Sequence, residues 1–229
     1  METTNITLEL YNPTHYNDLK SIMQTCFSDI GDVFASEEEL TLLSNLYPRG
    51  QIVCLLNGKV IGANLSRVVP FSKYKQPHTQ EMCIDLNTYI AETEIGDCVY
   101  GLDVFVNPTY QNLKIGKMLV KKFIENVFED NFYCMIGISR LTNYTNHVNE
   151  MDCMTYFEKV KNRELKDPVL GFHLGYGAEF VNISPNFSDD DKSSAGFGVT
   201  LAVYNPNYDS KKGIYLERIE KIDQYLVTG

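Results

Sequence analysis

A turn between an apolar strand and an amphipathic helix contains the residues of this chain that are best suited to chemistry. The segment from Gln111 to Lys117 follows the pair Asn107-Pro108 and precedes a helical pattern. The first N–H groups of a helix have no partner within it, and the positive end of the helix dipole attracts anions. Gly116 lets the backbone approach a ligand with no side chain in the way. The segment therefore predicts a pyrophosphate-binding turn.

The elements on either side must hold this turn in place. Residues 99–106 are apolar and β-branched enough for a buried strand, which ends at Pro108 because proline offers no ladder donor. After the turn, apolar residues recur at helical spacing with charged residues between them. One face of this helix should therefore pack against the core, and the other should face solvent. These apolar residues are Leu119, Val120, Phe123, Ile124 and Val127. An ordinary strand-to-helix turn that binds nothing is the alternative interpretation.

The turn resembles the signature of the GNAT superfamily of acyl-CoA N-acyltransferases, which reads Q/R-x-x-G-x-G/A after a V-x-P strand end. Val106 and Pro108 match the strand end, and Gln111 and Gly116 match the turn. Lys114 stands at the first glycine position. The resemblance implies an α/β fold, a mixed sheet of the α+β kind flanked by helices, whose central strands splay apart to admit the pantetheine arm.

A longer stretch is similar to the acetyltransferase half of bacterial proteins that fuse this domain to a nitrilase-type carbon-nitrogen hydrolase. The similarity runs through residues 156–180 and continues with the acidic turn 189–191 and the pair Asn205-Pro206. It extends over residues 5–209 through short anchors. In that subgroup a basic residue replaces the first motif glycine, which accounts for Lys114.

The resemblance implies a transferase that moves an acetyl group from acetyl-CoA to a primary amine, either a small amine or an exposed amino group. The amine attacks the thioester directly, and a backbone N–H near Val106 stabilises the tetrahedral oxyanion. No metal is implied. The implied cofactor-binding residues are Phe105 and Val106 along the pantetheine and Gln111, Asn112, Leu113, Lys114, Ile115, Gly116 and Lys117 around the phosphates.

The same resemblance indicates Asp103, His173 and Tyr176 as catalytic candidates. Asp103 lies on the central strand, on the same face as Phe105, and would take the proton of the amine. His173 stands where many of these enzymes have a tyrosine that acts as an acid, and Tyr176 is three residues further on. Each has an alternative. Asp103 could bond a neighbouring loop, His173 could be a packed helix residue, and a thiolate can leave without any acid.

Other polar residues also have two interpretations. Lys114 and Lys117 could pair with phosphates or solvate the helix start, and the unfavourable position of a cation there favours a ligand for at least one of them. The triplet 189–191 could attract a polyamine or form a solvated turn. His78 and His147 lie in polar stretches and have no recognisable partners.

Composition and charge exclude several classes of function. The formal charge of −10 opposes nonspecific binding to nucleic acids or anionic membranes. Six scattered cysteines without a C-x-x-C pair predict reduced thiols and no metal site. No apolar run approaches the ~20 residues that span a bilayer, and no signal-peptide pattern begins the chain. We expect a cytoplasmic protein with a single domain over residues 1–229, of which 210–229 form a tail or an extra element.

Further patterns give the order β-α-α-β-β-β-α-β-α-β-β. Ser36 and Glu39 form a capping-box pattern before a helix, and Asn57-Gly58 between two apolar runs indicates a hairpin. Residues 70–97 are polar and lack a strong period, so they predict a loop excursion, which with residues 144–154 would face the acceptor. The other expected elements are strands at 6–10, 134–139, 180–183 and 198–204 and helices at 13–27 and 167–176.

Three other functions are compatible with these patterns. The chain could be a noncatalytic acyl-CoA-binding or regulatory module, a partner subunit for a separate hydrolase, or an α/β domain whose turn binds nothing. Cofactor binding would separate the enzyme and the module from the last of these. Amine-dependent release of a thiol would separate the enzyme from the module. Size on purification would test for a hydrolase partner or a homodimer.

Overall fold

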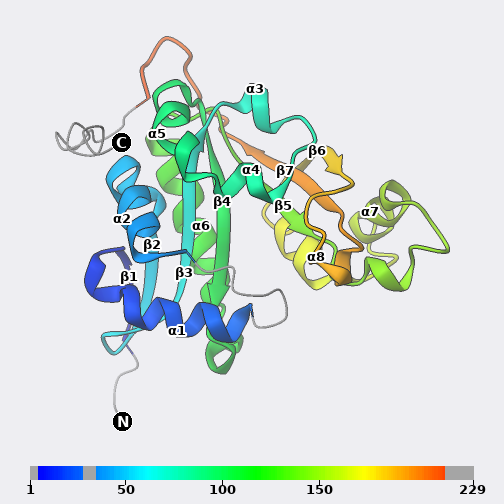
Figure 1. Cartoon of the computed structure of the whole chain (residues 1–229), viewed down its shortest axis with the longest axis horizontal. Helices are drawn as coiled ribbons and strands as arrows, with labels where there is room; N and C mark the ends of the chain where they lie inside the picture. The colour runs from blue at the N-terminus through cyan, green and yellow to red at the C-terminus, as the bar shows by residue number, and fades with distance from the viewer. Residues whose placement is uncertain (1–4, 28–34, 215–229) are drawn as a thin grey trace.

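Seven strands form one mixed sheet in the order β1-β2-β3-β4-β5-β7-β6. The computed structural model describes residues 5–27 and 35–214, so most of the expected C-terminal element at 210–229 lies outside the described residues. Figure 1 shows β1 to β4 on one side and β5, β7 and β6 on the other. The strands are β1 (Ile6–Leu10), β2 (Ile52–Leu56), β3 (Lys59–Val69), β4 (Cys98–Val106), β5 (Cys134–Arg140), β6 (Glu179–Ser184) and β7 (Gly198–Tyr204).

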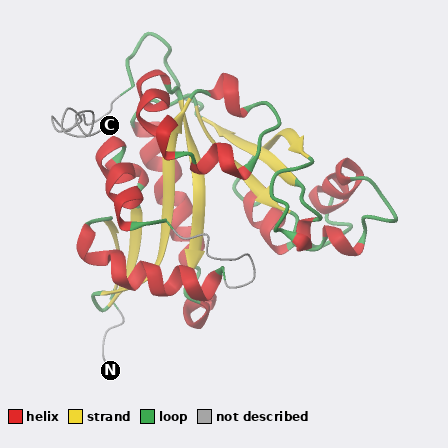
Figure 2. Cartoon of the chain, viewed as in Figure 1, coloured by secondary structure: helices red, strands yellow, loops and turns green. Residues whose placement is uncertain are grey.

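Helices cover both faces of this sheet (Figure 2). They are α1 (Tyr16–Cys26), α2 (Glu37–Leu46), α3 (Phe71–Tyr74), α4 (Gln80–Ile84), α5 (Leu86–Ile95), α6 (Ile115–Glu129), α7 (Cys153–Lys161) and α8 (Pro168–Leu174). Helices α1, α2 and α5 bury leucine, isoleucine and tyrosine side chains with Phe105 on one face. Helix α6 packs Leu119, Phe123 and Val127 on the other face. The expected mixed α/β architecture is therefore confirmed.

Local signals predicted the start of α2 and the hairpin between β2 and β3 correctly. Ser36 accepts a hydrogen bond from the Glu39 backbone N–H at 3.0 Å and caps α2. The turn between β2 and β3 has positive φ at Asn57 and Gly58, which is the conformation that a two-residue hairpin turn requires. In the part of the chain that the structure describes, no helix is long and apolar enough to cross a membrane.

Strands β4 and β5 run in parallel and then part. They pair from Cys98 with Cys134 to Gly101 with Gly137, and beyond this point β4 continues to Val106 with no strand of the described chain beside that edge. The register between β3 and β4 shifts between Leu65 and Ser66, which leaves Leu102 as an extra residue beside the parting point. Such a bulge re-aims the strand that contains it. The expected splay is thus present, and a β4 edge faces the gap.

The expected loop at 70–97 was wrong, because the segment forms α3, α4 and α5. Helix α5 buries Tyr89, Glu92 and Thr93, so its inward face is largely polar and produces no hydrophobic period. Glu92 is tolerated inside because Arg67 donates to it at 2.7 Å and Tyr74 donates at 3.0 Å. A buried charge of this kind is invisible to a pattern of apolar residues.

Helix α7 was also absent from the expected order, although its signal is in the sequence. Cys153, Tyr156, Phe157 and Val160 are buried at positions i, i+3, i+4 and i+7. Asp152 caps the helix by accepting from the Thr155 backbone N–H at 2.7 Å. The segment predicted to face the acceptor at 144–154 precedes this helix and contributes no residue to the central cavity described next.

Candidate functional site

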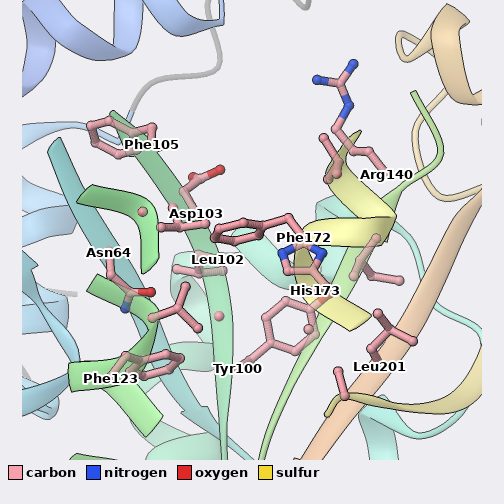
Figure 3. Close-up of a pocket in the computed structure, with 18 of the residues that line it drawn as sticks. Asn64, Tyr100, Leu102, Asp103, Phe105, Phe123, Arg140, Phe172, His173 and Leu201 are labelled. Atoms are coloured by element: carbon pink, nitrogen blue, oxygen red, sulfur yellow. The ribbon is translucent and has the colours of Figure 1, made fainter. Parts of the chain in front are cut away.

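A cavity of about 760 Å³ occupies the gap between β4 and β5. This volume lies within the roughly 300–1,000 Å³ typical of small-molecule sites. Apolar and aromatic side chains form most of its wall, and Asp103 is the one carboxylate among the described residues that line it. Figure 3 shows Asp103 and Phe105 on β4 across the cavity from His173 and Arg140.

The turn before α6 opens onto one end of this cavity. Residues Pro108–Leu113 form a 3-10 helix, and Lys114 then adopts φ 59° and ψ 23°, the left-handed conformation that glycine prefers. No side chain caps the N-terminus of α6 at Lys114. The first N–H groups of α6 are thus left to a ligand or solvent. Lys114, at the first glycine position of the motif, thus adopts a conformation that glycine reaches at lower cost.

The predicted cofactor residues divide into three groups. Those that line the cavity are Phe105, Val106, Gln111, Lys114, Gly116 and Lys117. Asn112 and Leu113 are exposed on the outside of the turn. The Ile115 side chain is fully buried in the core beneath α6, so only its backbone can face a ligand.

Gly116 lies beneath Phe172 of α8. A Cβ atom at Gly116 would stand 3.5 Å from the Phe172 ring and 4.0 Å from Val106 Cγ2, which are ordinary van der Waals contacts. Folding therefore does not require glycine at this position. Only a bound ligand would require the absence of a side chain at Gly116.

The open edge of β4 presents backbone groups to the cavity. Asn107 N donates to Ile61 O at 2.8 Å, and alternate residues of an antiparallel ladder point their N–H and C=O groups to opposite sides. The N–H groups of Val104 and Val106 therefore point away from β3 and toward the gap. The Cys26 thiol donates to Val106 O at 3.4 Å, which agrees with this direction.

Asp103 projects from β4 on the Phe105 face, as predicted, and its carboxylate makes no hydrogen bond or ion pair with any described residue. The neighbouring-loop bond proposed as its alternative is therefore absent from the described structure. The side chain is exposed, but it opens into the cavity and protein surrounds it. Removal from bulk water, aided by the negative charge of Glu39, raises the pKa of Asp103 to about 7. Near neutral pH this carboxyl group can therefore accept or release a proton.

His173 and Tyr176 come from α8 and the turn that follows it. His173 lines the cavity, and its Nδ1 is buried with no partner in the described part of the chain. Burial lowers the pKa of His173 to about 4, so the imidazole is neutral at physiological pH and has no imidazolium proton to supply as an acid. Tyr176 does not line the cavity. Its ring meets Phe172 edge-on at 5.2 Å, and its buried hydroxyl has no described partner.

Tyr100 and His78 form a buried pair that the sequence did not reveal. His78 Nδ1 lies 2.8 Å from Gln76 O, which can only accept, so Nδ1 carries the proton. His78 Nε2 then accepts from the Tyr100 hydroxyl at 3.0 Å. The Tyr100 proton is therefore committed to His78, and the Tyr100 ring forms apolar wall. The expectation that His78 lacks a partner was wrong, because the partner lies on a distant strand.

Arg140 at the end of β5 lines the cavity and forms an ion pair with Asp191. Asp191 accepts from Arg140 Nε at 2.7 Å and from Arg140 Nη2 at 2.9 Å. Asp191 also accepts from the Ser194 hydroxyl at 2.6 Å, and together these hydroxyl and guanidinium donors hold the pKa of Asp191 well below its usual range. Asp191 of the acidic triplet is thus a structural anion and is not available to a polyamine.

No group of three or more His, Cys, Asp or Glu side chains that could hold a metal occurs among residues 5–27 and 35–214. Asn64 is a further cavity residue that the sequence did not single out. Its amide donates to Gly50 O at 3.1 Å, which fixes the side chain against the turn that precedes β2. No short motif marks Asn64, Tyr100 or Arg140, because their proximity arises from strand pairing.

Comparison with known proteins extends these observations. The chain is 27% identical over 205 residues to the uncharacterized N-acetyltransferase YkwB of Bacillus subtilis strain 168, which covers 89% of this chain and 90% of that protein. It is 30% identical over 169 residues to the probable hydrolase YhcX of the same organism, covering 73% of this chain. The matched part is 33% of YhcX, so this chain spans about a third of that relative.

Two solved structures share the fold. The loading GNATL domain of CurA from Lyngbya majuscula superposes with a TM-score of 0.74 at 23% identity, over 87% of this chain and 98% of that domain. The GphF GNAT-like decarboxylase, solved in complex with isobutyryl-CoA, has a TM-score of 0.72 at 22% identity, over 86% and 98%. The model of the acetyltransferase (GNAT) family matches residues 16–147, more than half of the sequence. The chain therefore belongs to the GNAT acetyltransferase family.

Proposed function

We propose that this protein is an N-acetyltransferase that transfers the acetyl group of acetyl-CoA to a primary amine. The observation that carries the proposal is one continuous cavity. An uncapped helix N-terminus at Lys114–Gly116 stands at one end, and an unpaired carboxylate at Asp103 lies within. The first feature suits the pyrophosphate of coenzyme A, and the second suits an amine that must lose a proton.

Each step of the acetyl transfer is assigned to residues of α6 or β4. The N–H groups at the start of α6 hold the phosphates, while the β4 edge bonds the pantetheine arm. The N–H of Val106 or Val104 donates to the carbonyl oxygen as negative charge develops on it. Asp103 takes the proton that the attacking amine loses when its nitrogen forms the new C–N bond. The C–S bond then breaks and the thiolate of coenzyme A leaves. His173 lines the cavity and stays a candidate for a second proton transfer, whereas Tyr176 lies outside the cavity wall.

Thermal unfolding with saturating acetyl-CoA tests the proposal most directly. A ligand present at one hundred times its dissociation constant adds about 2.7 kcal/mol, which raises the midpoint of a domain of this size by roughly 5–11 °C. We expect this shift with acetyl-CoA and a smaller one with dephospho-CoA, whereas NAD should produce none. Absence of a shift with any coenzyme A ester would contradict the proposal.

Lys114→Gly separates the backbone role of this position from its charge. A non-glycine residue in the left-handed region costs of order 1 kcal/mol, so glycine should leave the unfolding midpoint unchanged or raise it slightly. If the ammonium group pairs with a phosphate, the dissociation constant of acetyl-CoA should increase about 3- to 10-fold at low salt, and less at high salt. Titration calorimetry at two salt concentrations measures both. An unchanged affinity at low salt would assign Lys114 to solvation only.

Decarboxylation of an acyl-CoA is a second candidate, because GphF, a GNAT-like decarboxylase solved in complex with isobutyryl-CoA, shares the fold over 86% of this chain. In that reaction the C–C bond to the carboxylate breaks, CO₂ leaves, and the resulting enolate takes up a proton. Release of CO₂ from malonyl-CoA without an amine would support this candidate. Thiol release that depends on an amine would support acetyl transfer.

A noncatalytic acyl-CoA-binding module is the remaining alternative. Such a module would bind acetyl-CoA and yet release no thiol with any amine. It would also be indifferent to the identity of residue 103. The Asp103→Asn variant separates such a module from the enzyme.

A further inference from the structure

Two glycines lie side by side where β4 and β5 part. Gly101 pairs with Gly137, and Gly137 pairs in turn with Leu201 on β7. Gly101 and Gly137 both line the cavity. Directly paired residues of neighbouring strands project to the same face of a sheet. Gly101 and Gly137 therefore leave a stretch of that face beside Leu201 without side chains.

Apolar side chains surround the two glycines. Phe123 and Val120 of α6 line the cavity here, together with Met135 of β5. Figure 3 shows Phe123 on one side of the cavity and Leu201 on the other. A Cβ atom at Gly101 would stand 3.7 Å from Phe123 Cε1, an ordinary van der Waals contact, so the Phe123 ring forms the wall beside Gly101. The cavity therefore has an apolar lobe, defined by Gly101, Gly137, Val120, Phe123, Met135 and Leu201.

An acetyl group would not reach this apolar lobe. The backbone N–H groups that can bond a thioester oxygen belong to Val104 and Val106, on the open edge of β4. Val104 pairs with Asn64 and Gly101 with Ser66, so Gly101 lies about 7 Å from Val104 along the strand. A single methyl group placed at Val104 would leave the lobe empty, whereas a chain of several methylenes would enter it.

We propose that the site prefers acyl-CoA esters with a medium-length apolar acyl chain, with the apolar lobe as the chain-binding subsite. This inference rests on the proposed acyl-CoA site and replaces acetyl by a longer acyl group as the preferred group. Moving one methylene from water into an apolar environment favours binding about fourfold. Hexanoyl-CoA should therefore bind at least about tenfold more tightly than acetyl-CoA, even if only part of the chain is buried.

Calorimetric titration of the full chain with coenzyme A, acetyl-CoA, butyryl-CoA and hexanoyl-CoA tests the inference without an amine. We expect similar affinities for coenzyme A and acetyl-CoA and a steady gain through butyryl-CoA to hexanoyl-CoA. Equal affinities for all four ligands would overturn the inference and leave the proposed function intact. Failure of all four to bind would overturn both.

Gly101→Ala then locates the subsite. The new methyl group fits beside Phe123 without a clash, and glycine at this position has no positive φ that alanine could not adopt. We expect Gly101→Ala to bind acetyl-CoA within about twofold of the natural protein and to lose most of the gain for hexanoyl-CoA. The matched control is Gly171→Ala, where a Cβ meets nothing within 4 Å.

Two outcomes of the variant experiment would overturn the assignment of the lobe. One is an undiminished preference for hexanoyl-CoA in Gly101→Ala. The other is an equal loss of affinity for acetyl-CoA and hexanoyl-CoA, with the unfolding midpoint unchanged. If Gly101→Ala does not fold, Leu201→Phe fills the lobe from the opposite side and is expected to give the same pattern. The ligand series with the natural protein decides the preference independently of either variant.

Discussion

Asp103→Asn is expected to lower kcat/KM for amine acetylation by about 10²- to 10⁴-fold, which is the usual contribution of general base catalysis. Asparagine keeps the shape of the side chain and cannot accept the proton. The dissociation constant of acetyl-CoA should change little, because no predicted cofactor contact involves the carboxylate. Steady-state kinetics with a responsive amine, together with calorimetry for acetyl-CoA, measure the two effects separately.

The pH dependence gives this prediction a second readout. Burial in the cavity raises the pKa of Asp103 to about 7, so kcat/KM of the natural protein should rise with pH through this value as the carboxylate forms. In Asp103→Asn that inflection should disappear. A profile with the same inflection in both proteins would assign the titration near pH 7 to another group and contradict the role of Asp103 as the base.

The pH dependence of stability provides a third readout, because stability should fall as pH rises whereas kcat/KM should increase. The folded state holds the Asp103 proton between its ordinary pKa of about 4 and the raised value of about 7, whereas the unfolded state has released it. The folded protein therefore loses stability as pH rises through this window. Asp103→Asn should unfold at a higher temperature than the natural protein at pH 8, with the difference vanishing near pH 4. A structural role for Asp103 predicts a lower midpoint instead.

Gly116→Ala should weaken acetyl-CoA binding by roughly ten- to a hundredfold while the fold stays intact. Each charge-assisted hydrogen bond from a backbone N–H to a phosphate is worth about 1.5–3 kcal/mol, and a methyl group at this position holds the ligand away. The protein itself tolerates the methyl group, because the nearest atoms would be 3.5 Å away in the Phe172 ring. The unfolding midpoint without ligand should be equal or slightly higher, since alanine favours a helix.

Gly171→Ala is the matched control for this experiment. It also places a methyl group on a helical glycine, but on the exposed side of α8 away from the cavity. It should leave the affinity for acetyl-CoA unchanged. If Gly116→Ala bound acetyl-CoA as tightly as Gly171→Ala, the turn before α6 would not hold the phosphates and the assignment of residues 111–117 would be withdrawn.

Elements with a local signal could be read from the sequence. Asn57-Gly58 determines the hairpin because this pair adopts positive φ at low cost. Ser36 determines the start of α2 because its hydroxyl satisfies a backbone donor within the same turn. The strand, turn and helix around Gly116 were found for the same reason. Helix α7 shows that a local signal can also be overlooked.

Helices α3 to α5 could not be read in this way. Their inward faces contain a polar network in which Glu92 meets Arg67, Lys73 and Tyr74. Each partner lies at least 18 residues away from Glu92 along the chain. The hydrophobic period that identifies an amphipathic helix is lost when a buried charge is stabilised by such distant partners.

The sequence by itself determined the turn from Gln111 to Lys117, the strand that leads to it and the face of that strand on which Asp103 lies, because each depends on residues a few positions apart. Only the tertiary structure decided what surrounds them. The parting of β4 from β5 after Gly101 and Gly137, the placement of His173 and Arg140 across the gap, and the raised pKa of Asp103 all depend on segments far apart in the chain. Backbone conformation is a short-range property, whereas a cavity and its electrostatics are made by every element that surrounds it.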